Sequence, residues 1–115
     1  MKIIVETVHT ELTPALTAYI KEKLEPVGKL LRSLERRSES QLAVEVGKTT
    51  RHHRKGPVFR AEANLKIGGT MLRGEANEED IRKAIDVLKD ELKQEIIRFK
   101  EKNAAQSRRR SRSID

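Results

Sequence analysis

A dense group of side chains that could bind phosphate occupies the middle of the sequence. Arg51, His52, His53, Arg54 and Lys55 follow one another without a break, shortly before an alternating strand pattern begins. Arginine and lysine bind phosphate oxygens through charge-assisted hydrogen bonds, and a loop lets such groups approach a folded nucleic acid. We therefore expect this segment, the cationic loop, to contact a polyanion.

The paired histidines of this loop raise the question of metal binding or catalysis. Adjacent residues rarely converge on one metal ion, and the only other histidine of the chain is His9. An acid–base pair would need a cleft with tuned pKa values and a nucleophile, which an exposed cationic loop does not offer. Stacking on bases or contact with phosphates suits His52 and His53 better. The sequence thus predicts neither an enzyme nor a metal or cofactor site.

A second basic set is expected along the C-terminal helix. At about 100° per residue, an apolar stripe is formed by Ile81, Ile85, Leu88, Leu92, Ile96 and Phe99. Along one border of this stripe fall Arg82, Lys89, Lys93 and Lys100, which we call the basic row. Lysine stems commonly cover the edge of an apolar face, so the row is either a solvated border of the core or a phosphate-binding surface.

The charge of the whole chain favours a polyanionic partner. Its 115 residues include 25 Lys and Arg against 18 Asp and Glu, a formal net charge of +7. Residues 104–115 contribute four arginines and one aspartate, so 4 − 1 = +3 lies there and +4 remains elsewhere. This segment has few apolar residues and is predicted to be a disordered basic tail. The alternative is that a charged content of 37% only solvates the surface.

Composition also excludes several protein classes. The chain is long enough for one domain, predicted over residues 1–103. It has no cysteine, so disulfides and thiolate metal sites are ruled out. Charges at Lys2, Glu6 and Glu11 interrupt the apolar N-terminus, unlike a signal peptide, and no apolar run approaches the roughly 20 residues of a membrane span. We expect a cytosolic protein.

Periodicity predicts the elements that position the basic groups. Residues 2–8 are rich in β-branched residues and predict a strand. Thr13 followed by Pro14 predicts a helix start, and apolar residues at three- and four-residue spacing carry that helix to about Leu34.

The second half of the chain alternates before it becomes helical. Alternating apolar residues predict strands over 41–46, 58–67 and 70–76. Gly68 and Gly69 predict a tight hairpin between the last two strands, because such turns need positive φ values. Asn77 is predicted to cap the final helix, which runs to about Lys102.

The order βαβββα predicts an α+β fold, with a four-stranded sheet and both helices packed on one face. Arg60 and Lys66 then lie on the other, polar face. That face is not expected to stack RNA bases, because it lacks aromatic residues and Phe59 falls in the inward register.

Four segments together carry a family resemblance. They are KIIVETVHTELTPALTAYIKEKLE, RHHRKG, FRAEANL and GEANEEDIRKAIDVLKDEL, within about residues 2–102. In order and spacing they resemble the ribosome hibernation promoting factors, also called ribosome-associated translation inhibitors. The resemblance implies a fold similar to double-stranded RNA-binding domains. It also implies binding to the small ribosomal subunit, in the mRNA channel over the tRNA anticodon-stem sites, with translation inhibited under stress or in stationary phase.

The resemblance further implies that basic residues of helices and loops contact ribosomal RNA phosphates. The candidate RNA-binding residues are Lys23, Lys29, Arg51, His52, His53, Arg54, Lys55, Arg60, Arg73, Arg82, Lys83, Lys89, Lys93, Arg98 and Lys100. Where the family often reads D-K-L-x-R-Q, this chain reads DELKQE over 90–95, so Lys89, Lys93 and Arg98 are expected to compensate.

The expected partner is the small ribosomal subunit with its RNA, and neither a membrane nor a small-molecule substrate. Off the ribosome, the protein is expected to be a monomer. An alternative function is a free-standing double-stranded RNA-binding module, because A-form helices are recognised through phosphates and 2′-hydroxyls more than through sequence.

Overall fold

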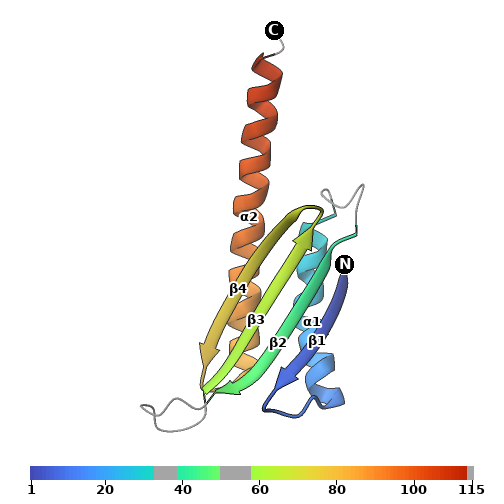
Figure 1. Ribbon diagram of the computed structural model, residues 1–115, viewed down its shortest axis with the longest axis vertical. Coiled ribbons are helices and arrows are strands. Elements are labelled where there is room, and N and C mark those ends of the chain that lie inside the picture. Colours follow the sequence, from blue (N-terminus) through green and yellow to red (C-terminus); the bar gives the residue numbers. More distant parts are fainter. Residues whose placement is uncertain (33–38, 50–57, 114–115) are drawn as a thin grey trace.

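The computed structural model describes residues 1–32, 39–49 and 58–113, with side chains as far as residue 106 (Figure 1). Its elements are β1 (Lys2–Val8), α1 (Pro14–Leu30), β2 (Gln41–Thr49), β3 (Val58–Ile67), β4 (Thr70–Glu78) and α2 (Ile81–Ser113). The predicted βαβββα order and α+β class are confirmed. The predicted bounds of β1 and β3 are those observed.

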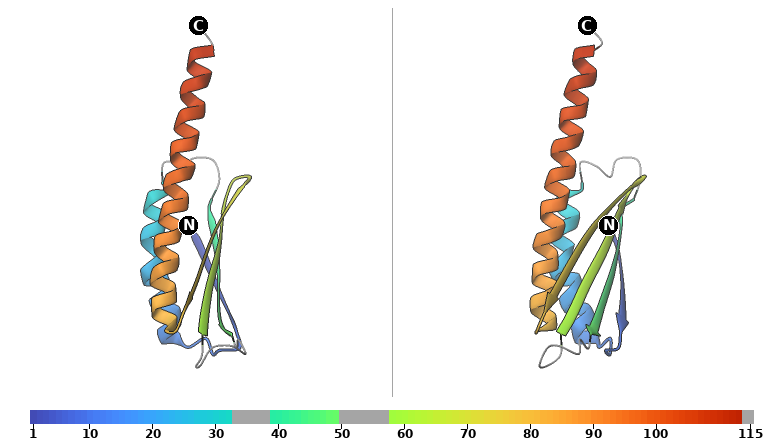
Figure 2. Two further views of the ribbon diagram at one scale, coloured as in Figure 1. Left: turned by 90° about the vertical axis from the view of Figure 1, so that its left-hand side faces the viewer. Right: turned by 60° about the vertical axis from the view of Figure 1, so that its left-hand side comes forward.

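The four strands form one sheet in the order β1-β2-β3-β4. β1 and β2 are parallel, and α1 makes the crossover that a parallel pair requires. The pairs β2–β3 and β3–β4 are antiparallel. Both helices cover one side of the sheet, and no described helix packs against the opposite side, which we call the open face (Figure 2).

The core lies between the sheet and the two helices. The predicted apolar stripes are confirmed, because buried residues recur along both helices: Ile20, Leu24, Val27 and Leu31 in and just after α1, and Ile85, Leu88, Leu92 and Ile96 in α2. Each such side chain contributes about 1.5–3 kcal/mol when it is fully buried. Among the described residues, no helix combines the length and apolar content that a membrane crossing requires.

Both ends of α1 have local hydrogen bonds that explain them. Thr13 Oγ1 accepts a hydrogen bond from the Leu16 N–H at 3.1 Å, with Pro14 in the first turn, so the predicted N-cap is confirmed. At the other end the Leu31 N–H donates to the Gly28 carbonyl at 3.1 Å, an i to i+3 contact that tightens the last turn. The helix therefore ends at Leu30, before the predicted end near Leu34.

The start of α2 corrects the predicted cap. Strand β4 continues to Glu78, and Asn77 is paired opposite Arg60 of β3, so Asn77 is not a cap. Asp80 takes that role: its Oδ1 accepts from the Arg82 N–H at 2.9 Å, and its carbonyl accepts from the Ala84 N–H at 3.0 Å. The pairing with β3 keeps the chain extended for longer than the local sequence suggests.

The end of α2 also differs from the prediction. The helix continues to Ser113, past the predicted end near Lys102, so residues 104–113 are helical where a disordered tail was expected. Alanine, glutamine and arginine favour helices, and neither glycine nor proline occurs between Lys102 and Ser113. This part of α2 projects beyond the sheet, and the molecule is 61 Å long against 30 and 19 Å in its other directions (Figure 1).

Candidate RNA-binding surface

The structure distributes the predicted RNA-binding residues over several places. Arg60 and Arg73 extend from the strands on the open face, whereas the basic row follows α2. Lys23 and Lys29 are both in α1. The residues of the cationic loop, Arg51, His52, His53, Arg54 and Lys55, lie outside the described residues.

Tyr19 joins the two helices at the start of the basic row. Its hydroxyl donates a hydrogen bond to Asp86 Oδ1 of α2 at 2.9 Å. Lys23 Nζ lies 5.6 Å from the centre of the Tyr19 ring, and Arg82 Cζ lies 5.1 Å from it. Both distances are in the cation–π range. Tyr19 therefore brings Lys23 of α1 next to Arg82, the first residue of the basic row.

The environment of Tyr19 keeps its hydroxyl protonated. Partial desolvation raises its pKa above the ordinary value of 10.0, and the hydrogen bond to Asp86 and the charge of that carboxylate act in the same direction. Arg82 acts in the opposite direction. At neutral pH the hydroxyl is thus a donor, and the bond to Asp86 is available to hold α1 against α2.

Sequence reasoning missed this bridge between the helices. A signal was present, because Tyr19 is the only tyrosine of the chain and precedes Lys23 by one helical turn. No pattern in the sequence pairs Tyr19 with Asp86, which lies 67 residues away.

The rest of the basic row lines α2 without carboxylate partners. Lys89, Lys93 and Lys100 are half-buried, as expected when lysine stems cover the edge of a core. Within the described part of the chain, no ion pair involves any of these lysines or Arg82. Their charges are therefore available to an external anion.

Two other predicted cations of α2 are already paired. Arg98 Nη1 lies 2.8 Å from Glu95 Oε1 in the same helix, and Lys83 Nζ lies 3.7 Å from Glu78 Oε2. Arg98 is thus less free than Lys89 or Lys93 to replace the cations that this chain lacks relative to its family pattern.

The open face neutralises its own arginines. Arg60 Nη2 lies 3.3 Å from Glu62 Oε2 and 3.1 Å from Glu75 Oε2, and Arg73 also pairs with Glu62. The strand register explains this crowding, because Glu45, Glu62 and Glu75 are direct neighbours across β2, β3 and β4. An RNA phosphate would have to compete with these carboxylates. The structure therefore separates Arg60 and Arg73 from the basic row, both in position and in electrostatics.

Comparison with known proteins gives a consistent result for most of the chain. Residues 3–104 match the family described as sigma 54 modulation protein / S30EA ribosomal protein. A ribosome hibernation promoting factor of Azotobacter vinelandii is 29% identical over 102 residues, which cover 89% of this chain and 85% of that protein. A ribosome hibernation promotion factor of Picosynechococcus sp. (strain ATCC 27264 / PCC 7002 / PR-6) is 24% identical over 104 residues, or 90% of this chain. The match spans 51% of the Picosynechococcus protein, about half its length.

Solved structures share the fold. A ribosomal subunit interface protein from Coxiella burnetii superposes with a TM-score of 0.67 at 20% identity, covering 87% of this chain and 98% of that one. The N-terminal domain of Thermus thermophilus Protein Y gives a TM-score of 0.63 at 25% identity, covering 86% and 99%. The family match over residues 3–104 confirms the resemblance drawn from the four sequence segments: the chain belongs to the sigma 54 modulation protein / S30EA ribosomal protein family.

Proposed function

We propose that this protein is a ribosome hibernation factor that inhibits translation under stress or in stationary phase. In this proposal it binds the small ribosomal subunit through ribosomal RNA, in the channel that otherwise holds mRNA and the tRNA anticodon stems. The family and the relatives named as hibernation promoting factors support a role on the ribosome. The site of action would be the cytoplasm.

The observation that carries the proposal is the basic row with Lys23 beside it. These cations lie along a packed helix pair and have no carboxylate partner among the described residues. Folded RNA presents phosphates at regular spacing, and a rigid row of cations can neutralise several of them at once. Release of the counterions around those phosphates then favours binding.

The mechanism requires no chemical step. The protein occupies the channel, and mRNA and tRNA are excluded by its volume while the ribosome stays intact. Lys29 and the cationic loop, with Arg51, Arg54 and Lys55, would add further phosphate contacts. His52 and His53 would contribute less charge, because unperturbed histidine is mostly neutral at neutral pH.

Cosedimentation with purified ribosomal subunits tests the proposal. We expect the protein to sediment with small subunits and not with large subunits. Small subunits that already hold mRNA and tRNA should bind less of it. In a cell-free translation assay it should lower protein synthesis in proportion to its occupancy. Equal binding to an unrelated RNA duplex and to small subunits, without displacement by mRNA and tRNA, would favour the free-standing RNA-binding module instead.

A further inference from the structure

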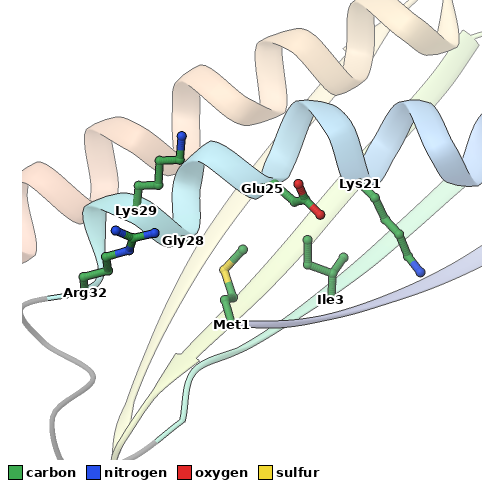
Figure 3. Close-up of a pocket in the computed structure, with 7 residues that line it drawn as sticks. All are labelled: Met1, Ile3, Lys21, Glu25, Gly28, Lys29 and Arg32. Atoms are coloured by element: carbon green, nitrogen blue, oxygen red, sulfur yellow. The ribbon is translucent and has the colours of Figure 1, made fainter.

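A cationic cleft lies on the side of α1 that faces away from Lys23 and the basic row. It is formed between α1 and the edge strand β1, and we call it the α1–β1 cleft (Figure 3). Its volume is about 520 Å³, and its lining residues are Met1, Ile3, Lys21, Glu25, Gly28, Lys29 and Arg32. Lys21 and Glu25 share one face of α1 by their spacing, about half a turn from Tyr19 and Lys23, and Arg32 follows just after the end of the helix. The cleft is therefore distinct from the basic row.

The charge of the cleft is positive. Lys21, Lys29 and Arg32 are exposed, and Glu25 is the single acidic residue that lines it. Within the described residues, none of these cations forms an ion pair. Lys29 and Arg32 lie together at one end, with Glu25 between them and Lys21 (Figure 3). Lys29 and Arg32 are three residues apart, and the Lys29 side chain points away from Met1 and Ile3, so an anionic group that meets both cations would lie at the outer edge of the cleft (Figure 3).

The wall of the cleft towards the core is apolar. Met1 and Ile3 are half-buried and pack against the core. Met1 packs against α1 beside Gly28, where an added Cβ atom would be in ordinary van der Waals contact with Met1, 3.4 Å from its Cβ and 3.5 Å from its Cε. A flexible thioether side chain adapts its shape to a flat ring or a sugar. The cleft thus combines an apolar wall with a cationic rim.

We propose that the α1–β1 cleft binds a nucleotide, with its phosphate on Lys29 and Arg32 and its sugar and base against Met1 and Ile3. A guanidinium next to an ammonium suits a phosphate group. The Glu25 carboxylate can accept hydrogen bonds from a ribose hydroxyl or an exocyclic amine. The volume falls in the range of about 300–1,000 Å³ that is typical of small-ligand sites.

The nucleotide could be free in solution or part of an RNA strand, and both sources present the same chemistry. The inference goes beyond the proposed function, because the cleft shares only Lys29 with the proposed ribosomal RNA contacts, faces away from the basic row, and can be measured without ribosomes.

NMR titration of the whole protein tests the inference. The probes are adenosine 5′-monophosphate, adenosine, inorganic phosphate and a short oligoadenylate. We expect the monophosphate or the oligoadenylate to shift the amide signals of Ile3, Gly28 and Arg32, and to bind more tightly than adenosine or phosphate alone. The double variant Lys29→Ala, Arg32→Ala should weaken this binding about tenfold or more, since a hydrogen bond to a charged group contributes about 1.5–3 kcal/mol.

Matched variants make the result specific. Lys66→Ala, Arg73→Ala removes the same residue types from the open face and should leave the cleft titration unchanged. Lys89→Ala, Lys93→Ala should also leave it unchanged while weakening ribosome binding, so that failure of one proposal can be told from failure of the other.

The two sources are separated by the oligoadenylate. Comparable affinity for monophosphate and oligoadenylate indicates a free nucleotide, whereas binding of the oligoadenylate alone indicates an RNA strand. The inference is overturned if neither probe shifts the cleft signals, if phosphate binds as tightly as the monophosphate, or if Lys29→Ala, Arg32→Ala binds like the parent.

Discussion

The open face and the helix-covered side of the protein both carry arginine and lysine, but in different electrostatic settings. On the open face, Arg60 and Arg73 are surrounded by glutamates that the strand register brings beside them. On the helix side, Arg82 and Lys89 form no ion pair with any described residue.

This difference shows why a count of cations does not identify an RNA-binding surface. An exposed ion pair contributes only about 0–1 kcal/mol to stability, but it cancels most of the field that a phosphate would experience. The open face can therefore be rich in arginine and still be a poor site for RNA. A surface of unpaired cations on a rigid helix is the better candidate.

The largest expected effect comes from removing matched charges on the two sides. The triple variant Arg82→Ala, Lys89→Ala, Lys93→Ala should weaken binding to small ribosomal subunits by roughly a hundredfold or more, since each charged hydrogen bond contributes about 1.5–3 kcal/mol. The open-face control Arg60→Ala, Lys66→Ala, Arg73→Ala loses the same formal charge and should change the affinity by less than about threefold. Filter binding measures both, with circular dichroism to check folding. Equal losses would show that net charge alone governs binding.

The salt dependence sharpens the same comparison. Log affinity should fall linearly with log salt concentration, and each lost phosphate contact should reduce the slope by about 0.7–0.9. The variant in Arg82, Lys89 and Lys93 should therefore lose roughly 2–3 from the slope. The control in Arg60, Lys66 and Arg73 should keep the slope of the parent. A parent-like slope for the first variant would mean that these side chains do not meet phosphates.

A smaller effect is expected on stability, because the basic row depends on how α2 packs on β4. Gly74 lies beneath α2, and a Cβ atom there would be 3.1 Å from Leu88 Cδ1 and 3.4 Å from Leu92 Cδ2. Gly74→Val should destabilise the protein by about 1–3 kcal/mol, and each kcal/mol lowers the Tm by about 4–8 °C.

The matched substitution is Gly69→Val in the β3–β4 turn, where nothing lies within 4 Å of an added Cβ and the φ angle is not positive. It should leave the Tm close to that of the parent in calorimetry. A similar loss for both variants would contradict the tight packing of β4 under α2.

The smallest effect concerns the bridge between the helices. Asp86→Ala should lower the pKa of Tyr19 towards 10.0 without restoring it fully, because partial desolvation remains the first cause of the shift. A raised folded-state pKa means that this contribution to stability is complete below about pH 10 and is lost as the pH rises through the folded pKa.

Alkaline titration of tyrosinate absorbance measures this shift directly, because Tyr19 is the only tyrosine. The control Asp90→Ala removes a carboxylate one turn further along α2 and should leave the titration unchanged. An unaltered midpoint in Asp86→Ala would show that Asp86 does not hold the hydroxyl in solution.

The sequence by itself determined the elements whose signals are local. The alternation in VFRAEANLKI predicted β3 with its observed bounds, and helical spacing predicted the buried stripe of α2. Thr13 and Pro14 marked the start of α1 correctly, since capping depends on residues within one turn. The basic row was predicted for the same reason: side chains on one helix are placed by a fixed rotation per residue.

Only the tertiary structure decided which cations are available to a partner. Arg60 meets Glu75 because β3 and β4 pair in one register, and that register also made Asn77 a strand residue and left the helix cap to Asp80. Tyr19 meets Asp86 because α1 and α2 pack side by side on the sheet. Contacts between residues far apart in the chain depend on how whole elements pack together, and no local pattern of residue types contains that information.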